Sequence, residues 1–421
     1  MVDADQTFVI VGGGLAGAKA AETLRAEGFT GRVILICDER DHPYERPPLS
    51  KSYLLGKKDR DGVLVHPPAW YASHDIELHL GQTVVTVDRA TRTVRYGDDG
   101  TRVRYDKLLL ATGAEPRRLD VPGTGLAGVH HLRRLAHAER FKGVLAALGR
   151  DNGHLVIAGA GWIGLEVAAA ARTYGAEVTV VEPAPTPLHG VLGPELGAVF
   201  AELHRSHGVR FRFGVSLTEI VGQDGVVLAA RTDDGEEHPA HDVLAAIGAA
   251  PRTALAEAAG LEIADRAHGG GIVVDERLRT SDPDIFAAGD AASFPHPLYG
   301  GRLRVEHWSN ALHGGPAAAR AMLGKEITYD DVPYFFTDQY DLGMEYSGWA
   351  PPGSYDQVVI RGDLGKREFI AFWLKDGRVL AGMNVNVWDV TADIQKLIRA
   401  GAAVDGEALA DPHVPLQSLV P

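Results

Sequence analysis

The sequence predicts an α/β fold with two similar βαβ units and a small C-terminal α+β domain. One pattern occurs twice, about 150 residues apart: an apolar β-type run, a glycine-rich turn and an Ala-rich helical run, then a second β-type run that ends in an acid. After residue 326 the composition changes, because aromatic residues and short alternating runs gather there. That change indicates a separate domain with an antiparallel sheet.

The first copy of the pattern begins with Phe8-Val-Ile-Val, which predicts a buried strand, and its helical run extends from Ala16 to Leu24. In a G-x-G-x-x-G turn the first glycine makes the bend, the second lets the backbone approach a pyrophosphate, and the third allows close helix–strand packing. Asp38 ends the following strand, where a carboxylate accepts hydrogen bonds from ribose hydroxyls. The residues expected to bind this first dinucleotide are Gly12, Gly14, Leu15, Ala16, Gly17 and Asp38.

The second copy begins with Leu155-Val-Ile-Ala, and its helical run extends from Ile163 to Ala171. Glu182 ends its second strand, where a carboxylate bonds both ribose hydroxyls of NADH and repels the 2′-phosphate of NADPH. Residues 183–189 offer no Arg or Lys that would hold such a phosphate, so NADH is the expected cofactor. The residues expected at this second site are Gly159, Gly161, Trp162, Ile163, Gly164 and Glu182. The two units are therefore predicted to be Rossmann-like dinucleotide-binding domains.

A third match to the glycine pattern, Gly123 to Gly128, is interpreted as a loop. With 50 glycines in 421 residues, about one chance match is expected in such a chain. Pro116 and Pro122 precede this match and no apolar strand leads into it.

The order of the apolar runs predicts how the domains divide the chain. One run ends at Gly113, a second at Gly248, and a third, Ile285-Phe-Ala-Ala, leads into Gly289 and Asp290, so the chain is expected to return to the first domain. A helical run from Ser309 to Leu323 follows, interrupted by Gly314, Gly315 and Pro316. The predicted domains are residues 1–115 with 245–325, residues 116–244, and residues 326–421.

Composition narrows the classes of function. The net charge of −14 argues against nucleic acid or an anionic membrane as a partner, and no apolar run approaches the ~18 residues of a membrane span. The single cysteine, Cys37, cannot form an internal disulfide and is expected to be a small core residue. No metal site is expected, and the protein is predicted to be cytoplasmic.

Several segments resemble the FAD-dependent, NADH-linked ferredoxin reductases of the putidaredoxin and rhodocoxin reductase type, which include reductase components of aromatic dioxygenases. The resemblance rests on Pro43-Tyr-Glu-Arg-Pro-Pro-Leu-Ser-Lys51 and continues, in order, through nearly the whole chain. The further matching segments are 111–113, 131–133, 159–166, 280–290, 305–311 and 338–340. The resemblance implies a glutathione-reductase-like arrangement with FAD at the first fingerprint and NADH at the second.

The resemblance also implies roles for individual residues. Asp290 would bind the ribityl chain of the flavin, although a helix N-cap would look the same. Arg46 and Arg133 would contact FAD, or else be solvated, and the backbone of Val84 would touch the adenine. Trp308 would flank the flavin or belong to the core, at the start of a helix whose N-terminus points to the flavin pyrimidine. The remaining implied cofactor contacts are Ala111, Thr112, Gly113, Gly289, Glu306, His307, Ile247 and Gly248.

Lys51 and Glu166 are the pair expected to carry chemistry. By resemblance, the lysine lies beside flavin N5 and the glutamate extends toward the nicotinamide. An ammonium there favours the negative charge that arrives with hydride, and a carboxylate would hold it in place. An ordinary structural ion pair is the alternative.

The absence of any C-x-x-C or C-x₄-C motif excludes dithiol chemistry, so electrons are expected to leave the protein singly. The expected acceptor is a ferredoxin, a small acidic iron–sulfur protein with a [2Fe-2S] or similar cluster, that serves a cytochrome P450 or an oxygenase. Direct reduction of a quinone or an ascorbyl-type radical is one alternative, and a redox-sensing interaction protein is another. Because this chain is acidic too, docking would need a local basic patch, with Lys51, Lys57, Lys58, Arg60, Arg302 and Arg304 as candidates.

Overall fold

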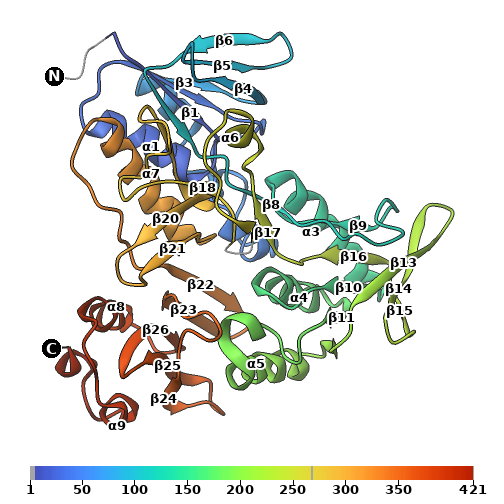
Figure 1. Cartoon of the computed structure of the whole chain (residues 1–421). Coiled ribbons are helices and arrows are strands. Elements are labelled where there is room, and N and C mark those ends of the chain that lie inside the picture. Colours follow the sequence, from blue (N-terminus) through green and yellow to red (C-terminus); the bar gives the residue numbers. More distant parts are fainter. Residues whose placement is uncertain (1–4, 267–268, 421) are drawn as a thin grey trace. The chain divides into compact units, whose positions relative to one another are not determined.

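The computed structural model describes residues 5–266 and 269–420, so the first four residues of the predicted first domain lie outside it (Figure 1). The chain forms two compact units. Unit 1 consists of Met1–Glu45, Arg60–Glu115 and Ala250–Tyr334, and unit 2 consists of Arg46–Asp59, Pro116–Ala249 and Phe335–Pro421. No helix in the described part of the chain is both long and apolar enough to cross a bilayer.

A parallel five-stranded sheet forms the centre of unit 1, and its strand order is β19-β7-β1-β2-β3. Strands β1, β2, β7 and β19 are short apolar runs that are mostly buried, as expected where both faces of a parallel sheet are covered, whereas only Ile76 is buried in the edge strand β3. Their bounds are β1 Thr7–Val11, β2 Arg32–Ile36, β3 Ile76–His79, β7 Lys107–Leu110 and β19 Ile285–Ala287.

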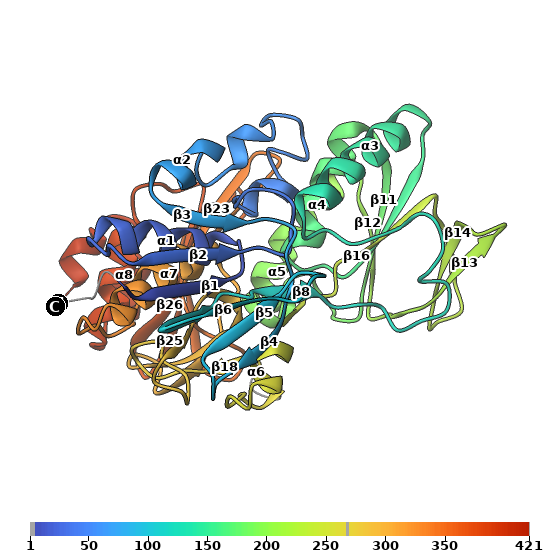
Figure 2. The ribbon, with the colours of Figure 1, turned by 90° about the horizontal axis from the view of Figure 1, so that it is seen from above.

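Helices α1 (Leu15–Ala26) and α7 (Trp308–Met322) pack tightly against each other in unit 1, as both ribbon views show (Figures 1 and 2). A Cβ on Gly315 would lie 2.1 Å from the carbonyl oxygen of Ala16. The expectation that Gly314, Gly315 and Pro316 interrupt the helix was wrong. These small residues instead allow the two helix backbones to approach each other within an unbroken helix.

Smaller elements complete unit 1. A β4-β5-β6 sheet and a β18-β20-β21 sheet accompany two short helices. Their bounds are α2 Pro68–Ser73, β4 Val84–Asp88, β5 Thr93–Tyr96, β6 Thr101–Arg104, α6 Ala254–Ala258, β18 Ile272–Val273, β20 Ala292–His296 and β21 Gly301–Leu303. The chain crosses between the units at β8 (Ala114–Pro116) and β17 (Ala249–Pro251).

Unit 2 contains a second parallel sheet, ordered β12-β11-β10-β16-β9. A three-stranded antiparallel sheet, β13-β14-β15, packs on it through a shared apolar cluster. The bounds are β9 Val129–His130, α3 Leu135–Arg150, β10 His154–Ala158, α4 Trp162–Tyr174, β11 Glu177–Glu182, α5 His189–Ser206, β12 Arg210–Phe213, β13 Leu217–Gln223, β14 Val226–Thr232, β15 Glu237–Pro239 and β16 Asp242–Ala245.

The C-terminal part of unit 2 is a five-stranded sheet, ordered β22-β23-β26-β25-β24, with antiparallel pairing along β23, β26, β25 and β24. The bounds are β22 Tyr334–Gln339, β23 Leu342–Gly348, β24 Gln357–Asp363, β25 Glu368–Lys375, β26 Arg378–Val385, α8 Thr391–Ala400 and α9 Gly406–Ala410. The sequence predicted this α+β domain, while its division from residues 116–244 stays a prediction.

Residues 46–59 fold with unit 2, although the sequence analysis assigned them to the first domain. A short 3₁₀ helix, Pro47–Ser50, lies in this segment. The hydroxyl of Tyr174 donates to the Leu54 carbonyl at 2.9 Å, and the hydroxyl of Tyr53 donates to Glu139 at 3.0 Å. These contacts attach the segment to α3 and α4.

Candidate cofactor and active site

The two glycine turns have the same geometry in the two units. Gly12 adopts φ = 117°, and a Cβ there would lie 2.1 Å from the carbonyl oxygen of Ala111. Gly159 adopts φ = 102°, and a Cβ there would lie 2.5 Å from the carbonyl oxygen of Ala246. Only glycine tolerates both the left-handed backbone and this closeness. In each unit the turn at the first glycine therefore lies directly against the backbone that follows the neighbouring parallel strand.

The third glycines bring each helix onto its own turn. A Cβ on Gly17 would lie 2.0 Å from the carbonyl oxygen of Gly12, and a Cβ on Gly164 would lie 2.2 Å from that of Gly159. The loop from Gly123 to Gly128, in contrast, leads into no helix, as expected.

The middle glycines face open space. A Cβ on Gly14 or on Gly161 would meet no atom within 4 Å. Helices α1 and α4 begin directly after these glycines, and among the described residues no side chain caps either helix and no acid lies in its first turn. Uncapped N–H groups beside an open backbone suit a pyrophosphate, so both turns fit a dinucleotide.

The predicted FAD residues of unit 1 gather at the carboxyl ends of neighbouring strands. Gly12 and Gly14 follow β1, Asp38 follows β2, Ala111 to Gly113 follow β7, and Gly289 follows β19 at φ = 72°. In open α/β sheets ligands bind at this edge. Val84, in contrast, opens β4 in the separate three-stranded sheet.

Arg252 connects three of these positions and was missed by the sequence analysis. Its Nη1 lies 3.0 Å from Asp38 Oδ2, and its carbonyl accepts a hydrogen bond from the Thr112 hydroxyl at 2.7 Å. Its backbone N–H donates to the Gly113 carbonyl at 2.9 Å. The chain returns to unit 1 at this point, so only the tertiary structure reveals the contacts.

Helix α7 begins at Trp308 with His307 as its N-cap residue, and its first turn contains no acid. Desolvation lowers the pKa of His307 to about 4, so its imidazole is neutral at pH 7. Glu306, just before the cap, accepts from Arg304 at 2.5 Å, and Arg304 also donates to the Asp290 carbonyl at 3.3 Å. The positive end of the helix thus remains available to an electron-rich group.

The predicted FAD residues Arg46, Lys51 and Arg133 belong to unit 2. Arg46 precedes the 3₁₀ helix, and its Nη1 donates to the carbonyl of Arg133 at 2.6 Å. The two arginines predicted to contact the flavin cofactor are therefore neighbours, and one orders the backbone of the other.

At the second fingerprint the Glu182 carboxylate is fixed by the backbone. One oxygen accepts from the N–H of Ala160 at 2.7 Å, and the other accepts from the N–H of Ala184 at 2.9 Å. Ile163 and Ile247 are 43% and 37% exposed, so apolar side chains are accessible in this region. Gly248 lies in the turn after β16 at φ = 93°. These residues lie at the carboxyl ends of β10, β11 and β16, as predicted.

The role of Trp162 in cofactor binding stays a prediction, and the described contacts of its ring are with aromatic side chains. The ring packs edge-on against Phe335 of β22 at 5.0 Å and against Phe200 of α5 at 5.7 Å. Phe335 in turn stacks on Tyr346. The side chain therefore attaches the start of α4 to the C-terminal sheet.

Lys51 and Glu166 form a buried ion pair, with 2.7 Å between Nζ and Oε1. Their side chains are 12% and 3% exposed, so solvent screens the pair far less than a surface pair. The Ser50 hydroxyl donates to Glu166 Oε2, and the Thr337 hydroxyl donates to Oε1 at 2.6 Å. The ring of Phe336 lies 5.5 Å from the ammonium. The pair was predicted from the sequence, whereas the two hydroxyls were not.

Cys37 is buried at 2% exposure, and desolvation raises the pKa of its thiol to about 12. It packs against the first fingerprint, since a Cβ on Gly13 would lie 2.3 Å from its sulfur. The prediction that Cys37 is a core residue is confirmed, and its thiol is not a nucleophile.

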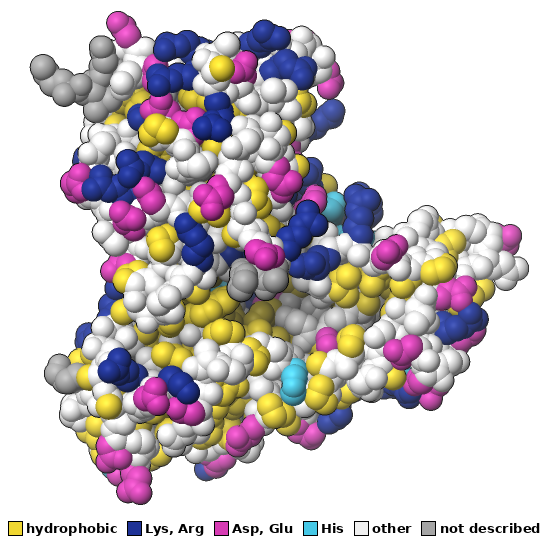
Figure 3. All heavy atoms as spheres, viewed as in Figure 1, with side chains coloured by type: hydrophobic (Ala, Val, Ile, Leu, Met, Phe, Trp, Pro, Cys, Tyr) yellow, Lys and Arg dark blue, Asp and Glu magenta, His cyan; other side chains and the backbone are white. Residues whose placement is uncertain are grey.

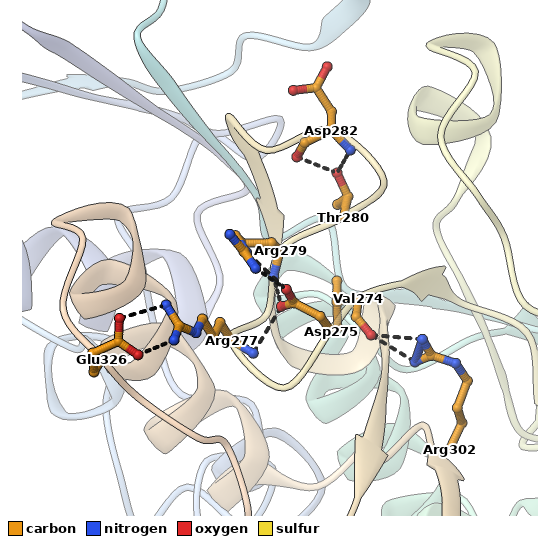
Figure 4. Close-up of polar contacts among 8 residues, drawn as sticks. All are labelled: Val274, Asp275, Arg277, Arg279, Thr280, Asp282, Arg302 and Glu326. Carbon is orange, nitrogen blue, oxygen red and sulfur yellow. Dashed lines mark hydrogen bonds and ion pairs between the residues drawn. The ribbon is translucent and has the colours of Figure 1, made fainter.

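Three of the candidate docking cations are already engaged within unit 1. The guanidinium of Arg302 donates to the carbonyls of Val274 and Ser293 at 2.8 and 2.9 Å, and Figure 4 shows the contact with Val274. Arg304 pairs with Glu306, as described above, and Arg60 pairs with Asp41. Lys57 and Lys58 are exposed. Because the other candidate cations are engaged, these two lysines are the best remaining candidates. The face drawn in Figure 3 mixes cationic and anionic side chains.

Comparison with known proteins identifies close relatives along the whole chain. A model described as pyridine nucleotide-disulphide oxidoreductase matches residues 6–315, and one described as reductase C-terminal matches residues 334–420. The chain is 39% identical to the probable ferredoxin reductase CtmF of Castellaniella defragrans over 419 residues, which cover 99% of this chain and 100% of that protein.

Two solved structures share the fold at similar identity. One is the covalent putidaredoxin reductase–putidaredoxin complex, with a TM-score of 0.92 and 36% identity over 99% of each chain. The other is the ferredoxin reductase for the CYP199A2 system from Rhodopseudomonas palustris, with a TM-score of 0.93 and 37% identity. That match covers 99% of this chain and 100% of the other.

Proposed function

The chain belongs to the pyridine nucleotide-disulphide oxidoreductase family and, within it, to the ferredoxin reductases; we propose that it transfers electrons from NADH through FAD to a ferredoxin. That ferredoxin would serve a cytochrome P450 or another oxygenase. FAD and NAD(H) are the cofactors of this protein. Bound FAD would accept a hydride and release its electrons one at a time.

The observation that carries the proposal is the pair of matching glycine turns, one in each unit. Both have an open middle glycine and an uncapped helix, so each fits the pyrophosphate of a dinucleotide. We assign FAD to Gly12–Gly17 in unit 1 and NADH to Gly159–Gly164 in unit 2. Asp38 and Glu182 would then bind the ribose hydroxyls of FAD and NADH.

Lys51 is proposed to lie beside flavin N5, and Glu166 is proposed to hold it there. A buried ammonium placed where negative charge arrives lowers the barrier to hydride transfer without transferring a proton itself. The 2.7 Å contact to a 3% exposed carboxylate fixes the position of the ammonium.

The acceptor is proposed to be a ferredoxin, a small acidic protein with a [2Fe-2S] cluster. The single cysteine of this chain is buried and protonated, so no dithiol takes electrons from the flavin. The relative named above was solved covalently bound to putidaredoxin, which supports a protein acceptor. A cytoplasmic location remains a prediction from the sequence.

Steady-state turnover with three acceptors tests the proposal. NADH is mixed with the purified holoenzyme and either a [2Fe-2S] ferredoxin, a soluble quinone or ferricyanide. Fast turnover with ferredoxin and ferricyanide but slow turnover with quinone is expected. Fast quinone reduction without ferredoxin reduction would assign the enzyme to small acceptors instead. Absence of ferricyanide turnover would reject NADH–FAD chemistry altogether.

A further inference from the structure

Strand β22 of the C-terminal sheet presents alternate residues to different surroundings. Phe335, Thr337 and Gln339 are buried, whereas Phe336 is half-buried and Asp338 is exposed. This is the two-residue period of a strand. The buried residues lie within unit 2, which contains β22 from Phe335 onward and all of α4 and α5.

Each buried residue of β22 contacts a helix that follows the second fingerprint. Phe335 packs on Trp162 at the start of α4, and Thr337 donates to Glu166 one turn later in the same helix. Gln339 Oε1 lies 2.8 Å from Nε2 of His204 in α5. The strand therefore contacts the Glu166 side of α4 with a hydroxyl, although 171 positions separate Thr337 from Glu166 along the chain.

The donors and acceptors of this network can be assigned in one direction. The Glu166 carboxylate only accepts, so Thr337 donates to it and receives a hydrogen bond from Gln339 Nε2 at 3.2 Å. Gln339 Oε1 then accepts from His204 Nε2. Burial lowers the pKa of His204 to about 4, so the ring is neutral and Nδ1 is free to accept from the Tyr340 hydroxyl at 3.4 Å.

We propose that Thr337 is a positioning residue for the Lys51–Glu166 pair: it fixes the carboxylate oxygen that holds the ammonium. The same atom, Oε1, receives both the Thr337 hydroxyl at 2.6 Å and Lys51 Nζ at 2.7 Å. The inference rests on the proposed function, in which Lys51 acts beside the flavin. It adds that the C-terminal sheet sets the geometry of hydride transfer.

The physical reason is that a buried carboxylate needs its donors. Ser50 holds Oε2, and Thr337 and Lys51 share Oε1. If the Thr337 hydroxyl is removed, Oε1 keeps only the flexible lysine as a donor, and the carboxylate loses one constraint on its rotation. The loss of this constraint weakens the placement of the ammonium.

The test compares Thr337→Val, which has nearly the same shape without the hydroxyl, with Thr337→Ser, which keeps it. Single-turnover mixing of the FAD-loaded enzyme with NADH gives the rate of flavin reduction. Thr337→Val is expected to slow reduction about tenfold at saturating NADH. Thr337→Ser is expected to stay within about twofold. If Thr337→Val does not fold, Thr337→Ala replaces it.

Thr232→Val is the matched control, because Thr232 is equally buried at 1% exposure and its hydroxyl bonds Asp234 outside this network. A similar slowing in Thr232→Val would overturn the proposal, because the loss of any buried hydroxyl would then be enough to slow flavin reduction. An unchanged rate of flavin reduction in folded Thr337→Val would also overturn it. If Thr337→Val has no effect, Glu166→Gln shows which proposal has failed. Normal flavin reduction in Glu166→Gln would reject the proposed role of the Lys51–Glu166 pair as well. Slow flavin reduction in Glu166→Gln would reject only the proposed role of Thr337.

Discussion

The Glu182 carboxylate accepts a hydrogen bond from the backbone N–H of Ala160 at 2.7 Å. Ala160 lies between the first two glycines of the second fingerprint, so the acid at the end of β11 is tied to the turn proposed to hold the pyrophosphate. A second bond, from the Ala184 N–H at 2.9 Å, fixes the other carboxylate oxygen. The charge that we propose selects the cofactor is therefore held rigidly.

We expect NADH to exceed NADPH in kcat/KM by at least about tenfold, because a 2′-phosphate would meet this fixed charge. Glu182→Gln keeps an acceptor oxygen for Ala160 and removes the charge, so it is expected to lower the ratio of kcat/KM for NADH to that for NADPH. Glu182→Arg is expected to lower this ratio further or to reverse the preference. Initial rates with both cofactors and ferricyanide measure the effect. Equal use of both cofactors by the unaltered enzyme would contradict the assignment.

Lys51→Met and Glu166→Gln are each expected to slow flavin reduction at least about tenfold while FAD stays bound, since each removes one half of the proposed pair. Stopped-flow absorbance of the flavin gives the rate, and the visible spectrum reports FAD content. Lys142→Met, on α3 beside Tyr53, is the control for loss of a lysine in the same unit. Wild-type rates in both variants would return the pair to a purely structural role.

Substitution of each middle glycine by valine is expected to affect the binding of one cofactor and not of the other. The purified protein should be yellow and carry about one FAD, and Gly14→Val should lose most of it. Gly161→Val should keep FAD and weaken NADH binding. Gly125→Val is the matched control, because this glycine also meets no atom within 4 Å but lies in the loop that mimics the fingerprint. FAD retained at wild-type occupancy in Gly14→Val would refute the placement.

Charge reversal at Lys57 and Lys58 is expected to raise KM for an acidic ferredoxin several-fold at low salt and to flatten its salt dependence. Turnover with ferricyanide should not change. Reversal at Lys366, an exposed lysine in the turn between β24 and β25, controls for net charge. Arg302 is unsuitable for this test, since its guanidinium binds two backbone carbonyls. If reversal at Lys366 changes the KM for ferredoxin as much as reversal at Lys57 and Lys58 does, ferredoxin docks elsewhere.

Stability should fall on acidification between about pH 6.5 and 4, partly through His204. Burial lowers its pKa from 6.5 to about 4, so in this window the unfolded chain binds a proton that the folded chain does not. The slope is at most about 1.4 kcal/mol per pH unit for each such group. His204→Asn should lessen the loss of Tm on acidification, whereas His207→Asn, at an exposed neighbour, should not. Parallel Tm–pH curves for all three proteins would exclude the contribution of His204.

The sequence by itself determined the features that depend on neighbouring residues. Apolar β-type runs, left-handed glycines and acids at strand ends are local, so both fingerprints, Asp38 and Glu182 were predictable. Cys37 was predictable as a core residue for the same reason. Helix α7 was only partly predictable. Glycines such as Gly314 and Gly315 disfavour a helix locally, but in the folded protein they lie within α7, where Gly315 packs against α1.

Only the tertiary structure decided which side chains from distant segments meet. Thr337 reaches Glu166, and Arg252 reaches Asp38 and Thr112, because strand pairing and helix packing bring those segments together. Arg302 and Arg304 looked like free surface charges and are engaged for the same reason. Periodicity along the chain fixes which face of an element is buried, but it does not specify the partner that covers that face.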